Sequence, residues 1–312
     1  MTFKNIVVVG GGVIGSQIAF QTAYCGFDVT ILLRNEQDIE ESKEKVENLK
    51  KIYLSTMEEM KTNKLAYCRG FSSEKNLTEE QIDELKDQVI KGYSNIKYSI
   101  DYEETFSDAD FVIEAIFEDL QQKRELYANI SKYLPKKTII VTNSSTILPS
   151  QIADVTGRPE KFLAFHFANK IWKSNTVEVM MHAETNPDYF EIAINFAEQI
   201  NMIPLRVQKE QKGYILNSIL IPFIDAAEAL WANEVAEPET IDKTWQLATG
   251  SKLGPFQIMD IVGINTLYNI KLMDPTVHDK KSISAKVAQK LKHMIDSGKL
   301  GTTTGEGFYK YY

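Results

Sequence analysis

Cysteine and histidine are scarce in this 312-residue chain, which contains two cysteines and four histidines. Two cysteines, Cys25 and Cys68, cannot build a disulfide framework, and no Cys/His cluster has the spacing of metal ligands. We therefore expect a protein of a reducing compartment that holds no metal.

The sequence also lacks long apolar runs and an excess of basic residues. No apolar run approaches membrane length, and the first five residues lead into an apolar segment without the features of a signal sequence. The net charge of -8 argues against a nucleic-acid or anionic-membrane partner, although a local basic pocket for phosphates is compatible with it. The composition, 43% apolar and 25% charged, is that of a globular protein of about two domains. These features predict a cytoplasmic protein with a small-molecule substrate.

A glycine-rich turn follows the first apolar segment, Ile6–Val9, and leads into a stretch with helical apolar spacing. Gly10 allows a tight turn, Gly12 lets the backbone approach a pyrophosphate, and Gly15 lets helix and strand pack closely. A second apolar segment, Asp28–Leu33, completes the pattern of a dinucleotide-binding fold. The predicted cofactor contacts here are Gly10, Gly12, Val13, Ile14, Gly15 and Leu33.

An expected carboxylate is missing after this second segment. NAD-binding units usually carry Asp or Glu there for the ribose 2′-hydroxyl, whereas this chain has Leu33 followed by Arg34. Arg34 could grip a 2′-phosphate, which favours NADP(H). Alternatively, Arg34 is an exposed side chain at the strand end, and Glu36 or Asp38 reaches the ribose. We expect NAD(H) or NADP(H), with NADP(H) favoured.

The remaining pattern predicts an α/β Rossmann-type domain, residues 1–207, followed by an all-α domain, residues 208–312. Residues 36 to about 95 have helical spacing, with a cap at Asn35 or Asp38 and a capping box at Thr78–Gln81, and they predict an inserted helical hairpin. Alternation of strands and helices then resumes and stops near residue 207. The strands expected there are 109–116, 138–142, 161–167, 176–180 and 202–207, with helices over 118–133 and from Asn186. The helices expected beyond them are 213–231, 238–249, 254–271 and 283–297.

His166 and Glu178 are candidates for proton transfer. A neutral imidazole is well suited to take a hydroxyl proton near neutral pH, and a carboxylate beside it fixes its tautomer and stabilises the imidazolium. Together with the dinucleotide pattern, this pair favours hydride chemistry on an alcohol or ketone.

The chain resembles the 3-hydroxyacyl-CoA dehydrogenase family over essentially its whole length, and especially its bacterial diketoreductase branch. The segments that carry the resemblance are Gly10–Gly15, Glu114–Glu118, Thr142–Thr146, His166–Asn169, Gly213–Asn217, Gly254–Asp260 and Gly305–Tyr309.

The resemblance implies roles for individual residues. His166 is implied to be the catalytic acid/base with Glu178 as its partner, while Ser145 and Asn217 hydrogen-bond the reacting oxygen. Both are neutral donors able to hold a ketone oxygen. The cofactor contacts implied are Glu118 and Lys123, near the nicotinamide ribose, together with Asn143 and Asn169. A homodimer formed through the helical domain is also implied.

Each of these residues also has a simpler interpretation. A histidine in an apolar strand is often a packed core residue, and Glu178 could be a carboxylate at a sheet edge. Residues 143–146 could be a turn that ends a strand, and Glu118 and Lys123 could be a solvated helix start.

The substrate is less strongly specified. Many acyl-CoA members of the family have proline after the asparagine of the histidine motif, whereas this chain has Lys170, followed by Ile171 and Trp172, which could reshape the acyl pocket. The insert has lysines for CoA phosphates, but glutamates are interleaved with them. We expect a short 3-hydroxyacyl-CoA such as 3-hydroxybutyryl-CoA. The alternatives are a diketoreductase acting on free or esterified 3-oxo acids, and a non-catalytic nucleotide-binding structural or sensor protein.

Overall fold

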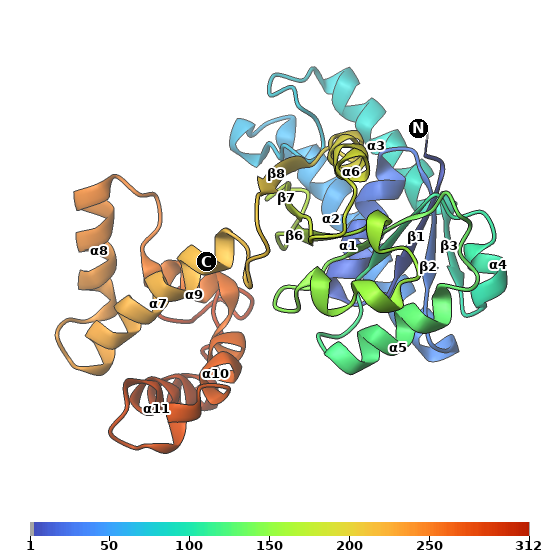
Figure 1. Cartoon of the computed structure of the whole chain (residues 1–312). Coiled ribbons are helices and arrows are strands. Elements are labelled where there is room, and N and C mark those ends of the chain that lie inside the picture. The colour runs from blue at the N-terminus through green and yellow to red at the C-terminus, as the bar shows by residue number, and fades with distance from the viewer. Residues whose placement is uncertain (1–2, 312) are drawn as a thin grey trace. The chain divides into compact units, whose positions relative to one another are not determined.

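A computed structural model describes residues 3–311, and the chain divides into two compact units, residues 1–215 and 216–312 (Figure 1). The first unit is an α/β unit and the second is helical, which confirms the predicted fold class. The sequence placed the boundary earlier, between residues 207 and 208.

The first unit is built on one eight-stranded sheet with the order β3-β2-β1-β4-β5-β6-β7-β8. Neighbouring strands are parallel except for β6 and β7, which are antiparallel. The strand order reverses beside β1, and in such sheets ligands bind at the carboxyl ends of the strands near this point. The strands are β1 (Asn5–Val9), β2 (Asp28–Leu32), β3 (Ile96–Ser99), β4 (Phe111–Glu114), β5 (Ile139–Thr142), β6 (Phe162–Phe167), β7 (Thr176–Met180) and β8 (Ile203–Val207).

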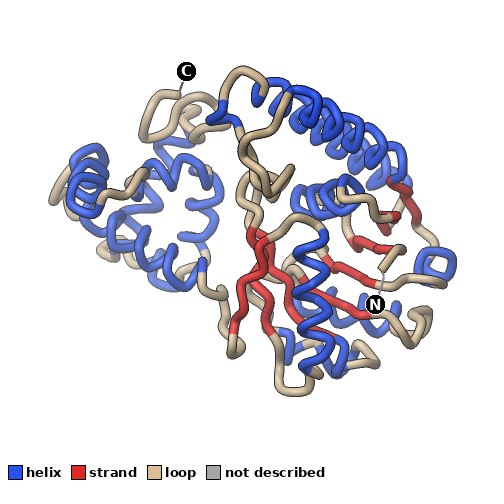
Figure 2. The backbone as a smooth tube through the Cα atoms, turned by 90° about the horizontal axis from the view of Figure 1, so that it is seen from above, coloured by secondary structure: helices blue, strands red, loops and turns tan. Residues whose placement is uncertain are grey.

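Both faces of the sheet are covered, as Figure 2 shows, where helices flank the strands on both sides. Ile6 and Val8 of β1 pack into one apolar cluster, whereas the alternating Val7 and Val9 pack into another. The first cluster includes side chains of α1, α2, α3 and α6, and the second includes those of α4 and α5. These helices are α1 (Val13–Tyr24), α2 (Glu36–Met60), α3 (Glu79–Asn95), α4 (Tyr102–Phe106), α5 (Leu120–Ile130) and α6 (Pro187–Gln199).

The inserted hairpin is formed by α2 and α3, as predicted. The side chain of Asn35 accepts a hydrogen bond from the Asp38 amide, which begins α2, and Thr78 and Gln81 form the reciprocal capping box that begins α3. The strand β3 and the short helix α4 were not predicted. Because β3 is a short, partly polar edge strand, its sequence has little of the apolar alternation that indicates a strand.

The helices of the second unit differ from the prediction in two places. The helix expected from residue 213 begins at Leu216, because Gly213 and Tyr214 have φ of 80° and 54°. Gly254 to Lys271 was expected to form one helix, but Gly263, with φ of 97°, ends one helix and begins another. The unit is formed by α7 (Leu216–Ala232), α8 (Pro238–Thr249), α9 (Pro255–Val262), α10 (Ile264–Leu272) and α11 (Ile283–Asp296). Short 3-10 helices lie at Lys64–Ala66, Pro149–Gln151, Ala153–Val155, Pro159–Lys161 and Pro275–His278.

Within residues 3–311, no helix is both long and apolar enough to cross a bilayer. The same residues contain no group of three or more His, Cys, Asp or Glu side chains placed to hold a metal ion.

Candidate active site

His166 and Glu178 form a buried pair on two adjacent strands. They lie directly opposite each other in the antiparallel pairing of β6 and β7, which brings side chains on the same face together. His166 Nδ1 lies 3.0 Å from Glu178 Oε2, and the two residues are 7% and 4% exposed. Since a carboxylate only accepts, Nδ1 carries the proton that it donates to Glu178. Nε2 is therefore the nitrogen available to take a proton.

Ser145 faces the other nitrogen of the imidazole. It lies in the loop after β5, and its Oγ is 3.1 Å from His166 Nε2. Glu118 holds this loop, because its Oε1 accepts hydrogen bonds from Ser144 Oγ at 2.7 Å and from the Thr146 amide at 2.6 Å. Burial alone would raise the pKa of Glu118, but the hydrogen bonds from Ser144 and Thr146 outweigh it and lower the pKa below its ordinary value. Glu118 is thus an ionised anchor for the loop that carries Ser145.

The glycine loop has the geometry that its motif predicts. Gly10 has φ of 108°, and a Cβ on it would lie 2.7 Å from the carbonyl oxygen of Ala115. A Cβ on Gly15 would lie 2.1 Å from the Gly10 carbonyl oxygen, whereas one on Gly12 would meet nothing within 4 Å. Gly12 begins α1 without a side-chain cap, so no cap side chain bonds the first amides of this helix. The residues fit a nucleotide pyrophosphate here.

A cavity of about 780 Å³ opens beside this loop. It is lined by Gly10–Gly12, by Leu33 and Arg34 after β2, by residues that follow β4, and by side chains along α5. Arg34 is 85% exposed and makes a two-pronged contact with the Asp38 carboxylate, with its Nε 2.7 Å from Oδ2. Arg34, expected to bind a 2′-phosphate, is therefore the partner of Asp38, one of the two carboxylates offered for the ribose.

Lys123 is buried in a network of polar side chains at the carboxyl ends of β4 and β5. It is 1% exposed, and its Nζ lies 2.5 Å from Glu114 Oε1 and 3.6 Å from Glu118 Oε2. Glu114 also accepts hydrogen bonds from Tyr127 and Thr142. The interpretation of Lys123 as part of a solvated helix start is wrong, because its ammonium group is buried and paired. The interpretation of Glu178 as a sheet-edge carboxylate is also wrong, since β7 lies between β6 and β8.

Comparison with known proteins identifies the family. Residues 5–211 match the model of the 3-hydroxyacyl-CoA dehydrogenase NAD binding domain, and residues 213–311 match that of the 3-hydroxyacyl-CoA dehydrogenase C-terminal domain. The chain belongs to the 3-hydroxyacyl-CoA dehydrogenase family. The family model supports NAD(H) as the cofactor class and an oxidoreductase activity.

Members of this family are similar to the chain along its length. The mitochondrial hydroxyacyl-coenzyme A dehydrogenase of Rattus norvegicus is 30% identical, over 99% of this chain and 91% of the relative. The 3-hydroxybutyryl-CoA dehydrogenase of Clostridioides difficile is 28% identical, over 98% of this chain and 99% of the relative. A solved structure shows a diketoreductase that performs dual catalysis on dicarbonyl compounds. It is 42% identical to this chain, and the match has a TM-score of 0.85 and covers 100% of both chains.

Asparagine side chains connect β6 and the loop after it to other parts of the first unit. Asn143 Oδ1 accepts a hydrogen bond from the Phe167 amide at 3.0 Å. Asn169 Oδ1 accepts one from Gln17 Nε2 of α1 at 2.8 Å, and Gln17 Oε1 accepts the Lys170 amide at 2.8 Å. These contacts fix the loop after His166 to the helix that follows the glycine turn.

The position of Trp172 in the sequence suggested that it shapes the acyl pocket, but its side chain is buried elsewhere. It is 8% exposed, and its ring packs against Tyr53 of α2 at a centroid distance of 5.5 Å. Gly70 of the insert donates its amide to the Trp172 carbonyl oxygen. Trp172 therefore fastens the helical insert to the loop between β6 and β7. Lys170 is one of the exposed residues of this loop, with φ of 57°.

Sequence reasoning missed some residues that the structure brings to this site. Tyr214 stacks on the His166 ring, the Ile215 amide donates to Glu178, and Gln17 holds the loop after His166. Glu114, the partner of Lys123, was also missed. Its sequence position could have indicated a site residue, since a carboxylate inside a buried strand segment requires partners. Asn217 belongs to α7 of the second unit, so its implied role stays a prediction.

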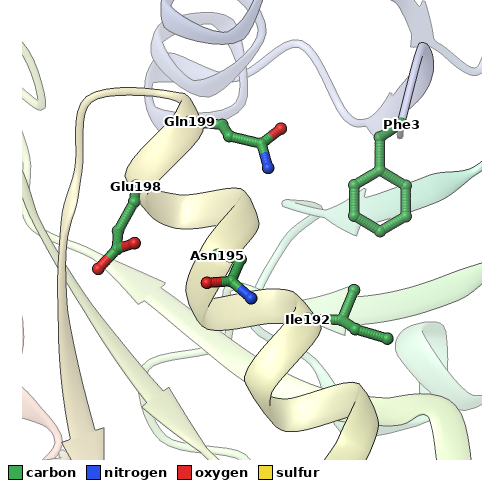
Figure 3. A pocket seen from close by; sticks show the side chains of 5 residues that line it. All are labelled: Phe3, Ile192, Asn195, Glu198 and Gln199. Carbon is green, nitrogen blue, oxygen red and sulfur yellow. The ribbon is translucent and has the colours of Figure 1, made fainter. Parts of the chain in front are cut away.

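A cavity of about 440 Å³ elsewhere in the unit contains none of these residues. Figure 3 shows it between Phe3 and the side of α6, where Ile192, Asn195, Glu198 and Gln199 complete its lining. Glu198 is the single ionisable side chain of this lining, which provides no acid/base pair.

Proposed function

We propose that the protein interconverts a short 3-hydroxyacyl-CoA, such as 3-hydroxybutyryl-CoA, and its 3-oxoacyl-CoA, with His166 as the acid/base. The observation that carries this proposal is the position of the His166 ring, which has Glu178 on Nδ1 and Ser145 beside Nε2. A substrate oxygen that hydrogen-bonds to Ser145 would lie within reach of the basic nitrogen.

The proposed proton transfer uses both nitrogens of the imidazole. A bound nicotinamide cofactor would supply hydride transfer between itself and the carbinol carbon. In oxidation, His166 Nε2 takes the hydroxyl proton, and Glu178 stabilises the resulting imidazolium through Nδ1. In reduction, the imidazolium returns that proton to the forming alkoxide. Ser145 holds the same oxygen in both directions, and we propose that Asn217 assists it.

We further propose that the nucleotide contacts are the glycine loop Gly10–Gly15, the end of β2 at Leu33 and Arg34, and Glu118, Lys123, Asn143 and Asn169. The open space at Gly12 supports the first of these. The buried Lys123 supports a structural contribution to the cofactor site through Glu118. NADP(H) is the proposed preference, because Arg34 follows β2 where a carboxylate is usual.

A second candidate function is the reduction of dicarbonyl compounds that lack CoA. It is favoured by the 42% identity to a diketoreductase over the full length of both chains. The two functions use the same chemistry at the reacting carbonyl and differ in the handle that the substrate carries.

The test compares substrates side by side. Reduction of acetoacetyl-CoA, acetoacetate and a simple 3,5-dioxo ester is followed by loss of reduced-cofactor absorbance with both NADH and NADPH. An enzyme built for CoA uses binding of that remote group to accelerate the reaction, so we expect the highest kcat/KM with acetoacetyl-CoA. If the small compounds match or exceed it, the diketoreductase candidate replaces the acyl-CoA proposal. No turnover with any of them would support a non-catalytic protein.

A further inference from the structure

The ring of Tyr214 lies flat against the ring of His166. Their centroids are 4.4 Å apart and their planes differ by 11°. Tyr214 is 1% exposed, and its hydroxyl donates to the carbonyl oxygen of Ser144 at 2.8 Å. The same side chain thus contacts the imidazole and the residue that precedes Ser145.

The backbone at this point is in an unusual conformation. Gly213 has φ of 80° and Tyr214 has φ of 54°, which places two consecutive residues in the left-handed region. A bulky residue rarely adopts this conformation, and such residues persist only where surrounding contacts hold them. Here the contacts are the stacked ring, the Ser144 carbonyl and the next amide, because Ile215 N donates to Glu178 Oε1 at 2.8 Å.

Residues 213–215 therefore contact His166, Glu178 and the residue before Ser145. Tyr214 contacts the His166 ring face, and its hydroxyl reaches the loop of Ser145. Ile215 occupies the Glu178 oxygen that His166 does not use. The two hydrogen bonds of the imidazole lie along its ring plane, whereas the tyrosine restrains it perpendicular to that plane.

We propose that Tyr214 is a positioning residue that holds the His166 imidazole in its working orientation and stabilises its protonated form. The face of an aromatic ring carries negative potential and attracts a cation, so the stack favours the imidazolium that forms during turnover. This inference rests on the proposed acid/base role of His166. It adds that the Gly213–Ile215 segment, which leads directly into α7, is part of the catalytic apparatus.

The test uses two variants of the full-length protein. Tyr214→Phe keeps the stacked ring and loses the hydroxyl, whereas Tyr214→Leu loses the ring. We expect kcat to fall about tenfold or more in Tyr214→Leu, since small displacements of a reacting group are expensive, while the cofactor KM stays unchanged. Tyr214→Phe loses the Ser144 hydrogen bond but keeps the stacked ring, so its kcat should fall less than that of Tyr214→Leu. Both are assayed with the better of the 3-oxo substrates compared above.

Proton NMR of the histidine rings provides a readout that does not depend on activity. A ring stacked on His166 moves its C–H resonances upfield, and the His166→Asn variant identifies them among the four histidines. We expect the upfield position in wild type and Tyr214→Phe, and its loss in Tyr214→Leu.

The proposal is overturned if a folded Tyr214→Leu keeps its kcat, or if Tyr214→Phe loses activity as strongly as the leucine variant. It is also overturned if wild type lacks the upfield resonance, which can be measured even where the leucine variant does not fold. Failure of the proposed function is distinguishable, because His166→Asn would then retain turnover.

Discussion

At the scale of single residues, the imidazole of His166 has a defined partner on each nitrogen. His166→Asn keeps a polar side chain of similar size and removes the base, so we expect turnover to fall by at least about a hundredfold while the fold and cofactor binding persist. Steady-state kinetics measure the loss, with circular dichroism and cofactor titration as controls. Near-normal turnover in a folded variant would contradict the mechanism.

Glu178→Gln is the companion variant. The Glu178 carboxylate accepts from both His166 Nδ1 and the Ile215 amide, and an amide side chain can accept only on its oxygen. One of the two donors then faces an NH₂ group, which favours the wrong imidazole tautomer or a displaced backbone. We expect a loss in the same direction as that of His166→Asn, but smaller.

The choice of cofactor is a second question at this scale. We expect NADPH to bind more tightly than NADH, and Arg34→Ala to remove the difference, because the guanidinium would give up its Asp38 contact for a 2′-phosphate. Titration of both cofactors into both proteins measures this. Arg206→Ala is the matched control, since Arg206 is also exposed and paired with a carboxylate on the same unit. Equal affinities in wild type, or an unchanged preference in Arg34→Ala, would leave Arg34 as a surface charge.

Residue identity predicted some of this site and not the rest. The pairing of His166 with Glu178 was predicted and is present, because both lie in short strands that readily pair. The Arg34–Asp38 contact was not foreseen, since each residue was weighed separately as a cofactor ligand. Tyr214 was quoted only within a motif, and its contact with His166 depends on a left-handed turn that no side-chain pattern indicates.

At the scale of elements, Trp172 joins the loop between β6 and β7 to the helical insert, although the sequence suggested a place in the acyl pocket. Trp172 packs among side chains of the helical insert and contacts Tyr53. We therefore expect Trp172→Ala to lower the free energy of unfolding by about 3–5 kcal/mol, as for other buried aromatic truncations, with little change in substrate preference. Urea denaturation measures the first and the substrate comparison the second.

Lys173→Ala, at an exposed position one residue later, is the matched control and should change stability by less than about 0.5 kcal/mol. A Trp172→Ala protein with wild-type stability and an altered substrate preference would contradict this structural role and would indicate that Trp172 lines the acyl pocket.

Strong local signals predicted the elements, and weak signals did not. Of the two caps offered for α2, Asn35 is the one present, and Thr78 caps α3 as predicted, because a side chain satisfies backbone donors there in any fold. Strand β3 was missed because it is stabilised by pairing with β2, which its own sequence does not show. The break at Gly263 was missed because glycine in an apolar-periodic run is compatible with a continuous helix.

At the scale of the whole molecule, the succession of an α/β unit and a helical unit followed from the sequence, because each unit buries its own apolar core. The distribution of the proposed site residues between the two units is less evident from the sequence. His166, Glu178, Ser145 and the glycine loop all lie in residues 1–215, whereas Asn217 is the one proposed site residue of the second unit.

We propose that exposed apolar side chains on the second unit form the interface of a homodimer. Ile219 on α7 is 67% exposed, Leu247 on α8 is 77% exposed, and Met273 after α10 is 80% exposed. Apolar surface gathered on one unit is typical of association sites. We expect light scattering after size exclusion to give about twice the 35.5 kDa chain mass.

The double variant Ile219→Glu/Leu247→Glu should shift the protein towards a monomer, because charges buried in an apolar interface are strongly unfavourable. Leu65→Glu is the control, since Leu65 is 94% exposed but lies in the helical insert of the first unit, and it should leave the mass unchanged. A wild-type protein that is monomeric at micromolar concentration would refute the assembly proposal. An unchanged mass in the double variant would instead show that the interface lies away from these two side chains. Turnover measured on the same samples would show whether activity depends on dimer formation.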